Sequence, residues 1–142
     1  MEEKMLKTTV LILALAFSSI SQAHENTALA EAMKEMGQQF RIIAGSFRSG
    51  EVTVQQLNAS ETLQMAIAES SQHLPVTART DAQKLAYMRS MAALAKEALV
   101  LEEQIEDILA SDSQDLTEMK NTVRRMNEMR SEGHDAFRES DH

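Results

Sequence analysis

The sequence predicts an all-α protein, an antiparallel up-down-up-down four-helix bundle, from three observations. First, aromatic residues make up only 4% of the chain, which has one proline and four glycines, so residues typical of strands and turns are scarce. Second, alanine, leucine, methionine, glutamate and glutamine, which favour helices, are abundant. Third, four stretches repeat apolar residues at helical spacing, short connections join them, and no stretch alternates as a strand does.

The beginning of the chain has the features of an export signal. A short apolar run from Thr8 to Phe17 follows two lysines, and Ala23 closes a small-residue motif typical of a cleavage site. The run is shorter than the ~20 residues that span a bilayer. We therefore expect residues 1–23 to be a signal peptide that is removed on export, leaving residues 24–142 as one periplasmic domain with no membrane association.

Composition and charge narrow the range of functions. The chain has no cysteine, which excludes disulfides, thiolate metal sites and covalent c-type haem attachment. Its net charge of −8 argues against binding to nucleic acid or to anionic lipid surfaces. We expect a monomer, and we expect any redox protein partner to present a basic patch to it.

The first helix is predicted from about Thr27 to Arg48. Arg48 near its end favours the helix dipole, and Gly50 is placed to end the helix in a left-handed C-cap. One face of this helix carries its large apolar residues, which are Leu29, Met33, Met36, Phe40, Ile43 and Phe47.

The second and third helices each begin with a capping box, formed by Thr53 with Gln56 and by Thr80 with Gln83. Pro75 ends the second helix, and the short connection after it requires the third helix to turn back. The inward face of the second helix is Leu63, Ala66, Ile67, Ser70 and Leu74, with Met65 to the side. The third helix repeats Met91, Leu94, Ala98, Leu101, Ile105 and Ile108.

The last helix carries the residue of greatest functional interest. Ser111 to Gln114 breaks the third helix and caps the last one, which continues to about Glu139. One of its faces is formed by Leu116, Met119, Val123, Met126, Arg130, His134 and Phe137. His134 therefore lies within an apolar face, where a histidine is either a hydrogen-bonded packing residue or a ligand.

Topology brings a second soft group close to this histidine. In an up-down-up-down bundle the first and last helices are antiparallel neighbours, so the start of one lies beside the end of the other. Met33 lies about 9 Å along its helix from Thr27, and His134 lies about 7.5 Å from Glu139. Because these depths are similar, we expect the thioether and the imidazole to face each other.

A facing methionine and histidine can ligate the iron of a haem from both sides. The soft sulfur favours Fe(II) and raises the reduction potential, and two strong ligands leave no open position for a substrate. A Met33–His134 pair of this kind would suit one non-covalent b-type haem, and such a site transfers electrons without catalysis. Arg130 and Arg138, one turn before and after His134, are placed to meet the haem propionates.

Two segments of the chain resemble the cytochrome b562 family of periplasmic b-type cytochromes. One is Leu29-Ala30-Glu31-Ala32-Met33 followed by Phe40-Arg41-Ile42-Ile43, and the other is Arg130-x-x-x-His134-x-x-x-Arg138 with the aromatic Phe137. The similarity extends from about Leu29 to Arg138 in order and length. It implies a four-helix bundle, haem ligation by Met33 and His134, and a role as a periplasmic electron carrier.

The chain departs from that family in its third helix, which in the family offers aromatic side chains to the porphyrin. Here Met88, Met91, Leu94 and Ala98 occupy the corresponding region. These side chains would hold haem loosely or leave the site empty. Met36, one turn from Met33, is a second candidate for the axial sulfur.

Two other functions remain open. One is copper binding, because the ten methionines and four histidines provide soft ligands for Cu(I), including His24 at the N-terminus left by signal cleavage. The methionines, however, are spread over the core faces of the helices and are not clustered in one segment of the chain. The other alternative is a periplasmic helical binding protein without haem. His73 and His142 are expected on the surface. No paired Glu-x-x-His, nucleophile motif or phosphate loop indicates an enzyme.

Overall fold

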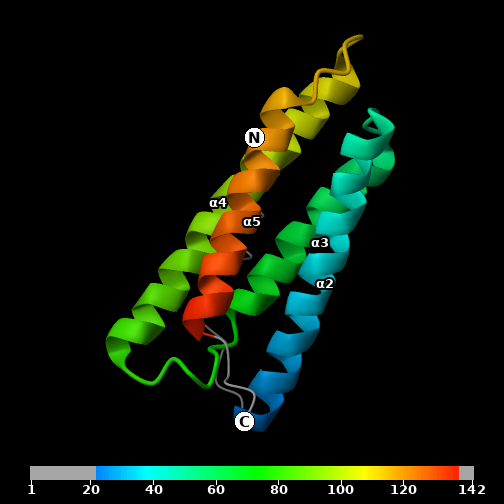
Figure 1. The fold of residues 1–142 in the computed structure, drawn as a ribbon. Helices are drawn as coiled ribbons and strands as arrows, with labels where there is room; N and C mark the ends of the chain where they lie inside the picture. Colours follow the sequence, from blue (N-terminus) through cyan, green and yellow to red (C-terminus); the bar gives the residue numbers. More distant parts are fainter. Residues whose placement is uncertain (1–21, 138–142) are drawn as a thin grey trace, which may run out of the picture.

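The computed structural model describes the backbone of residues 22–137 and the side chains of residues 27–133 and 135–137. This part of the chain forms four helices and no strand: α2 (Gln22–Ser49), α3 (Val54–Ser71), α4 (Asp81–Ala110) and α5 (Thr117–Phe137) (Figure 1). The prediction of an all-helical fold with four helices is confirmed. Most of the predicted signal peptide, and Arg138, lie outside the described residues.

Local sequence explains where several of these helices begin and end. Thr53 and Gln56 form the predicted capping box at the start of α3, and Thr80 and Gln83 form the one at the start of α4. Gly50, directly after α2, has a φ of 76°, a left-handed conformation that glycine adopts without steric strain. These boundaries agree with the sequence prediction because each depends on residues within one turn of the helix end.

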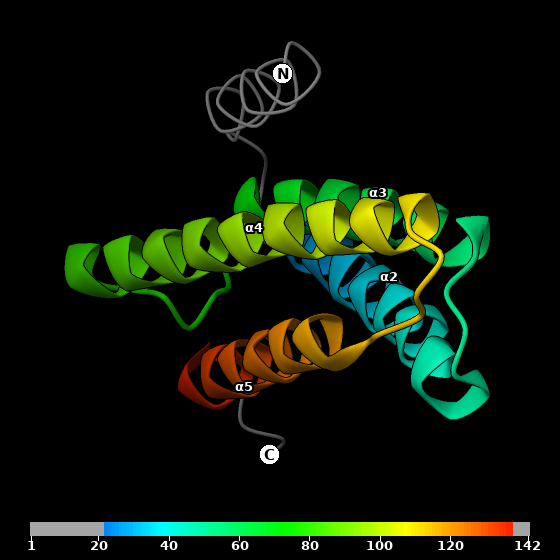
Figure 2. The same cartoon turned by 90° about the horizontal axis from the view of Figure 1, so that it is seen from above.

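The four helices surround one shared interior. Each packs against the helix before and after it in the chain, and α2 also meets α5 over a shorter stretch. The two views show α2 beside α3 and α4 beside α5 (Figures 1 and 2). Within the described residues, the backbones of α2 and α4, and of α3 and α5, do not approach one another. No described helix combines the length and the apolar content needed to cross a bilayer.

The predicted apolar faces fill the interior. Every residue of the α4 repeat is buried, from Met91 to Ile108, and so are Met119, Val123 and Met126 on α5. On α3, Leu63 and Ile67 are fully buried, whereas Met65 is 72% exposed, as its place beside the inward face predicts. The helical period of the apolar residues was therefore a reliable guide to the core.

The prediction for the start of the last helix was wrong. α5 begins at Thr117, after the predicted cap at 111–114, and Asp115 Oδ1 accepts hydrogen bonds from the backbone amide and the hydroxyl of Thr117. These two bonds lower the pKa of Asp115. The Gln114 side chain bonds to another part of the chain: its Oε1 accepts a hydrogen bond of 3.0 Å from the backbone N–H of Val52. The α4–α5 connection is thereby tied to the α2–α3 connection.

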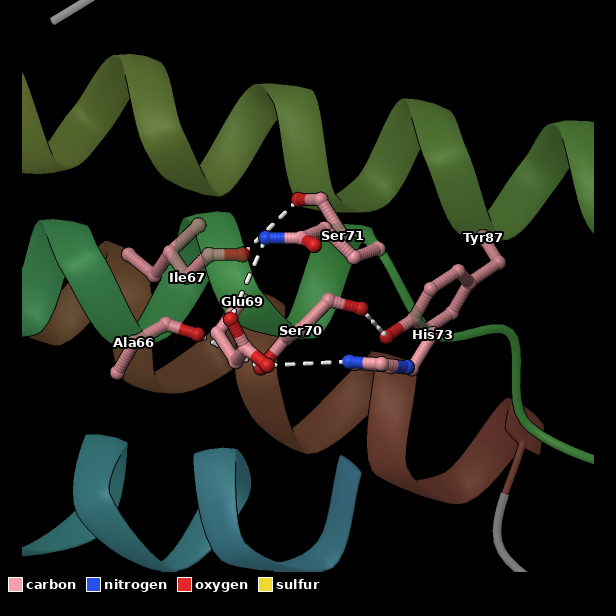
Figure 3. Close-up of polar contacts among 8 residues, drawn as sticks. Ala66, Ile67, Glu69, Ser70, Ser71, His73 and Tyr87 are labelled. Carbon is pink, nitrogen blue, oxygen red and sulfur yellow. Dashed lines mark hydrogen bonds and ion pairs between the residues drawn. The ribbon is translucent and has the colours of Figure 1, made fainter. Parts of the chain in front are cut away.

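The prediction that His73 lies on the surface was also wrong, since the residue is only 3% exposed. It follows the end of α3, and its Nε2 lies 3.1 Å from Oε1 of Glu69, one turn earlier (Figure 3). A carboxylate accepts hydrogen bonds only, so Nε2 is the donor. The surface prediction relied on the neighbouring Pro75 as a loop signal, but the packing of the other helices around this loop buries the ring.

Candidate functional site

A partly open cavity of about 910 Å³ lies where the start of α2, the α3–α4 connection, the start of α4 and the end of α5 meet. Ligand pockets in proteins commonly measure about 300–1,000 Å³. The cavity lies on the side where α2 and α5 face each other, and these two helices touch only over a short stretch. The fold therefore leaves room for a large ligand between its first and last described helices.

Methionine side chains from three helices line this cavity. They are Met33 and Met36 of α2, Met91 of α4 and Met129 of α5. Met36 and Met91 belong to the buried core, and Met33 and Met129 are partly buried against it. Thioethers are soft and polarizable, and they adapt to flat apolar surfaces. This wall is suited to an extended aromatic ligand or to a soft metal ion.

Two aromatic rings form another part of the wall. Tyr87 of α4 and Phe137 of α5 meet edge to face, with ring centroids 5.5 Å apart and an angle of 86° between the rings. The Tyr87 hydroxyl donates a hydrogen bond of 2.6 Å to the backbone carbonyl of Ser70 at the end of α3 (Figure 3). Burial raises the pKa of Tyr87, so the hydroxyl stays a neutral donor. These contacts join three helices at one side of the cavity.

The charged residues of the lining all carry positive charge. Lys34 and Arg41 come from α2 and Arg130 comes from α5, and no described lining residue carries a carboxylate. The whole chain has a net charge of −8, so the cavity has the opposite sign to the protein. A positive, partly enclosed site favours an anionic ligand.

Arg130 is the most constrained of these cations. Its guanidinium carbon lies 4.9 Å from the ring centroid of Phe40, a cation–π contact, and its Nη1 is buried without a hydrogen-bond partner among the described residues. Burial, and then the charge of Arg41, lower the pKa of Arg130. Arg125 on the same helix, in contrast, has a charged partner, because its Nη2 lies 3.3 Å from the carboxylate of Glu97. A buried donor without an acceptor is costly, so Nη1 of Arg130 marks a place for a ligand oxygen.

The α3–α4 connection closes one end of the cavity. Pro75 and Val76 belong to the lining, and Thr77 Oγ1 donates a hydrogen bond of 2.6 Å to the carbonyl of Phe137. This bond fastens the connection to the last described residue of α5. His73 lies close to this wall in the chain but is not part of the lining, and its Nδ1 has no partner among the described residues.

The predicted site residues are only partly within the described part of the chain. Met33 and Arg130 line the same cavity, and so does Met36, the second candidate sulfur. The backbone of His134 lies in α5 directly after Gly133, which also lines the cavity, but its side chain is outside the described residues. Arg138 lies beyond them as well. The assignment of ligands and propionate contacts therefore stays a prediction.

Sequence reasoning missed Tyr87, Lys34 and Arg41. Tyr87 supplies α4 with an aromatic wall residue, which the comparison of Met88, Met91, Leu94 and Ala98 had not anticipated. The signal was present, because Tyr87 precedes Met91 by four residues and so shares its inward face. Lys34 and Arg41 were also recognisable, since with Gly37 they repeat at three and four residues along the edge of the α2 apolar face.

Comparison with family models, curated proteins and solved structures found no match to this chain. The resemblance to the cytochrome b562 family therefore stays a prediction. Among the described residues there is also no group of three or more His, Cys, Asp or Glu side chains that could hold a metal ion.

Proposed function

We propose that this protein is a periplasmic electron-transfer protein whose four helices run up-down-up-down and whose cavity holds one non-covalent b-type haem. One observation carries the proposal. Met33 near the start of α2, and Gly133 and Phe137 on either side of His134 in α5, line a single cavity. Ligation of one iron by Met33 and His134 requires these parts of α2 and α5 to border the same cavity.

The lining is suited to haem in size, polarity and charge. The volume of about 910 Å³ falls within the usual range for ligand pockets, and most of the wall is apolar, including four methionines and two aromatic rings. Haem carries two carboxylates on an otherwise apolar ring. Arg130 offers a buried Nη1 without a partner among the described residues, which a propionate oxygen would satisfy. Arg138, one turn after His134, is the second proposed propionate contact.

The residues of the chain have distinct roles in this proposal. Met33 and His134 hold the iron, and the apolar wall keeps water away from the ring. The haem supplies one-electron redox chemistry, with the thioether favouring the reduced state. Two ligands from the protein leave no position for a substrate, so the proposed role is electron transfer to and from redox proteins, and not enzyme catalysis.

Titration of the purified protein with hemin tests this function. We expect sharp α and β absorption bands on reduction, typical of six-coordinate haem, and their loss in His134→Ala. His142→Ala is the matched control, because it removes a histidine from the end of the chain and should keep both bands. A wild-type protein that gives no six-coordinate spectrum, or an unchanged spectrum in His134→Ala, would contradict haem ligation by this residue.

The identity of the axial sulfur needs its own variants, because Met33 and Met36 both line the cavity. We expect Met33→Ala to weaken hemin binding without abolishing it, since the imidazole forms the stronger bond. The spectrum of the reduced form should change in Met33→Ala and stay as in the wild type in Met36→Ala. The reverse pattern would assign the bond to Met36.

Copper binding is a second candidate function, favoured by the four methionines that line one cavity. Thioethers are suitable ligands for Cu(I). Metal analysis of the protein after incubation with Cu(I) separates the two functions. Copper retention without a haem Soret band would favour the copper site, and neither signal would indicate a helical binding protein without either cofactor.

A further inference from the structure

Two guanidinium groups converge on the space above Gly37 of α2. A Cβ atom at Gly37 would lie 3.7 Å from Nη2 of Arg41 and 3.9 Å from Nη1 of Arg130. Both nitrogens therefore lie within 4 Å of one point at the cavity wall. Arg41 comes from the same helix as Gly37, whereas Arg130 reaches this point from α5.

Each guanidinium group makes one further contact near this point. Nε of Arg41 donates a hydrogen bond of 3.4 Å to the carbonyl of Gly37, and the guanidinium of Arg130 lies over the ring of Phe40. An arginine side chain whose orientation is already constrained loses less conformational entropy when it binds an anion. Arg130, whose Nη1 is buried, is thus pre-positioned, whereas Arg41 is exposed and its hydrogen bond to Gly37 is long.

The charges at this place are uncompensated within the described residues. Neither Arg41 nor Arg130 forms an ion pair there, and Nη1 of Arg130 is buried without an acceptor. Two like charges at close range repel each other, and the pKa of Arg130 is lowered partly for this reason. An anion between the two groups would remove the repulsion and supply the missing acceptor.

We infer that Arg41 and Arg130 together bind one carboxylate of the cavity ligand, with Gly37 leaving the space that this carboxylate occupies. A carboxylate has two oxygens, each able to accept a charge-assisted hydrogen bond of about 2.7–2.9 Å from a guanidinium, so it can bridge the pair. This inference rests on the proposed function in taking the ligand to be a porphyrin, and it adds Arg41 as a binding residue.

The test uses metal-free protoporphyrin IX and its dimethyl ester, which differ only in their carboxylates. Neither has an iron, so the proposed axial bonds cannot contribute to binding. Fluorescence titration should show that wild-type protein binds the diacid more tightly than the ester. Arg41→Gln and Arg130→Gln should each weaken binding of the diacid about tenfold, the loss expected for one charge-assisted hydrogen bond, and should leave binding of the ester unchanged.

The controls are Arg48→Gln on α2 and Arg124→Gln on α5, two exposed arginines that do not line the cavity. Both should bind the diacid as the wild type does, and helical circular dichroism should show that all variants are folded. The double variant Arg41→Gln/Arg130→Gln should lose less than the product of the single losses, because both residues act on the same carboxylate.

Equal losses for the diacid and the ester would overturn the inference, since they would indicate a packing role for the arginines. Unchanged binding of the diacid in Arg41→Gln, or a fully multiplicative loss in the double variant, would overturn it too. The haem proposal is tested separately by the hemin spectra. A protein that gives no six-coordinate haem but still binds the diacid through both arginines would keep the carboxylate site and lose the proposed function.

Discussion

The two halves of the helical domain are built from similar residues but packed differently. The closed half comprises the end of α2, the start of α3, the end of α4 and the start of α5, and its side chains Ile43, Leu63, Leu101, Ile105 and Met119 are fully buried. The open half comprises the opposite ends of these helices and surrounds the cavity of about 910 Å³. There Met33, Met129 and Phe137 are only partly buried, although Met36 and Met91 on the same wall are buried.

The contrast teaches that apolar content alone does not close a core. In the closed half, the hydrogen bond from Val52 to Gln114 draws two connections together. In the open half, Gly37 and Gly133 present no side chain to the space between α2 and α5, and Arg130 brings a charge that apolar neighbours cannot satisfy. Met119 is fully buried in the first half, whereas four methionines line the cavity in the second.

The largest expected difference between the halves is in the response to truncation. Leu101→Ala should lower the free energy of unfolding by about 2–5 kcal/mol, because it opens a new void in the closed half. Met91→Ala should lower it by less, since one side of Met91 already faces the cavity. Urea denaturation followed by circular dichroism measures both values.

Met65→Ala is the control for these truncations, because Met65 is 72% exposed and its loss should change stability by no more than about 0.5 kcal/mol. Equal losses for Leu101→Ala and Met91→Ala would contradict the distinction between the two halves.

An intermediate effect is expected at the aromatic wall of the open half. Tyr87→Phe should lower the free energy of unfolding by about 1–3 kcal/mol, because it leaves the buried carbonyl of Ser70 without its donor while keeping the ring against Phe137. The pH dependence sharpens this prediction. Burial raises the pKa of Tyr87 above its ordinary value of 10.0, so its contribution is present below pH 10 and lost as the pH rises further.

Alkaline denaturation curves of the wild type and of Tyr87→Phe therefore provide the measurement. The stability difference between them should shrink above about pH 10, the ordinary tyrosine pKa. A constant difference across this range would mean that the Tyr87 hydroxyl is not held neutral by the fold.

The smallest expected change in stability, but a clear change in binding, is at Gly37. Gly37→Ala should raise the free energy of unfolding by about 0.5–1 kcal/mol, because glycine is unfavourable inside a helix and the new methyl group has ordinary contact distances. It should also weaken binding of protoporphyrin IX, since the methyl group occupies the space between Arg41 and Arg130. Thermal unfolding and fluorescence titration give the two readouts.

Gly45→Ala is the matched control on the same helix. A Cβ there would have a similar ordinary contact, 3.9 Å from Nη2 of Arg48, and Gly45 does not line the cavity. We expect the same gain in stability and no change in porphyrin binding. A loss of binding in Gly45→Ala equal to that in Gly37→Ala would show that the effect comes from helix rigidity instead of occupied space.

Much of the fold was predictable because it depends on neighbours in the sequence. The capping boxes at Thr53 and Thr80, the left-handed Gly50 and the apolar repeat of α4 each involve residues within a few turns of one another. The start of α5 was missed although its signal is local. Residues 111–114 offer several capping side chains, but the carboxylate that accepts hydrogen bonds at the helix start belongs to Asp115, whose partner is Thr117.

The candidate site was predictable only in part. The helical period and the bundle topology led to Met33 and Arg130, which do line one cavity. They did not lead to Arg41, whose importance comes from a second arginine 89 positions away in the chain and from the glycine between them. The burial of His73 was missed for a similar reason, since it depends on how the other helices pack around a short connection.

By itself, the sequence of this protein determined which segments become helices and which face of each helix is apolar, since both properties arise from residues one or two turns apart. Only the tertiary structure decided which half of the domain stays open, because that depends on how closely α2 and α5 approach and on which side chains lie between them. The pairing of Arg41 with Arg130 follows from the same long-range geometry. Charge repulsion and an unsatisfied buried donor then turn this geometry into a site for an anion.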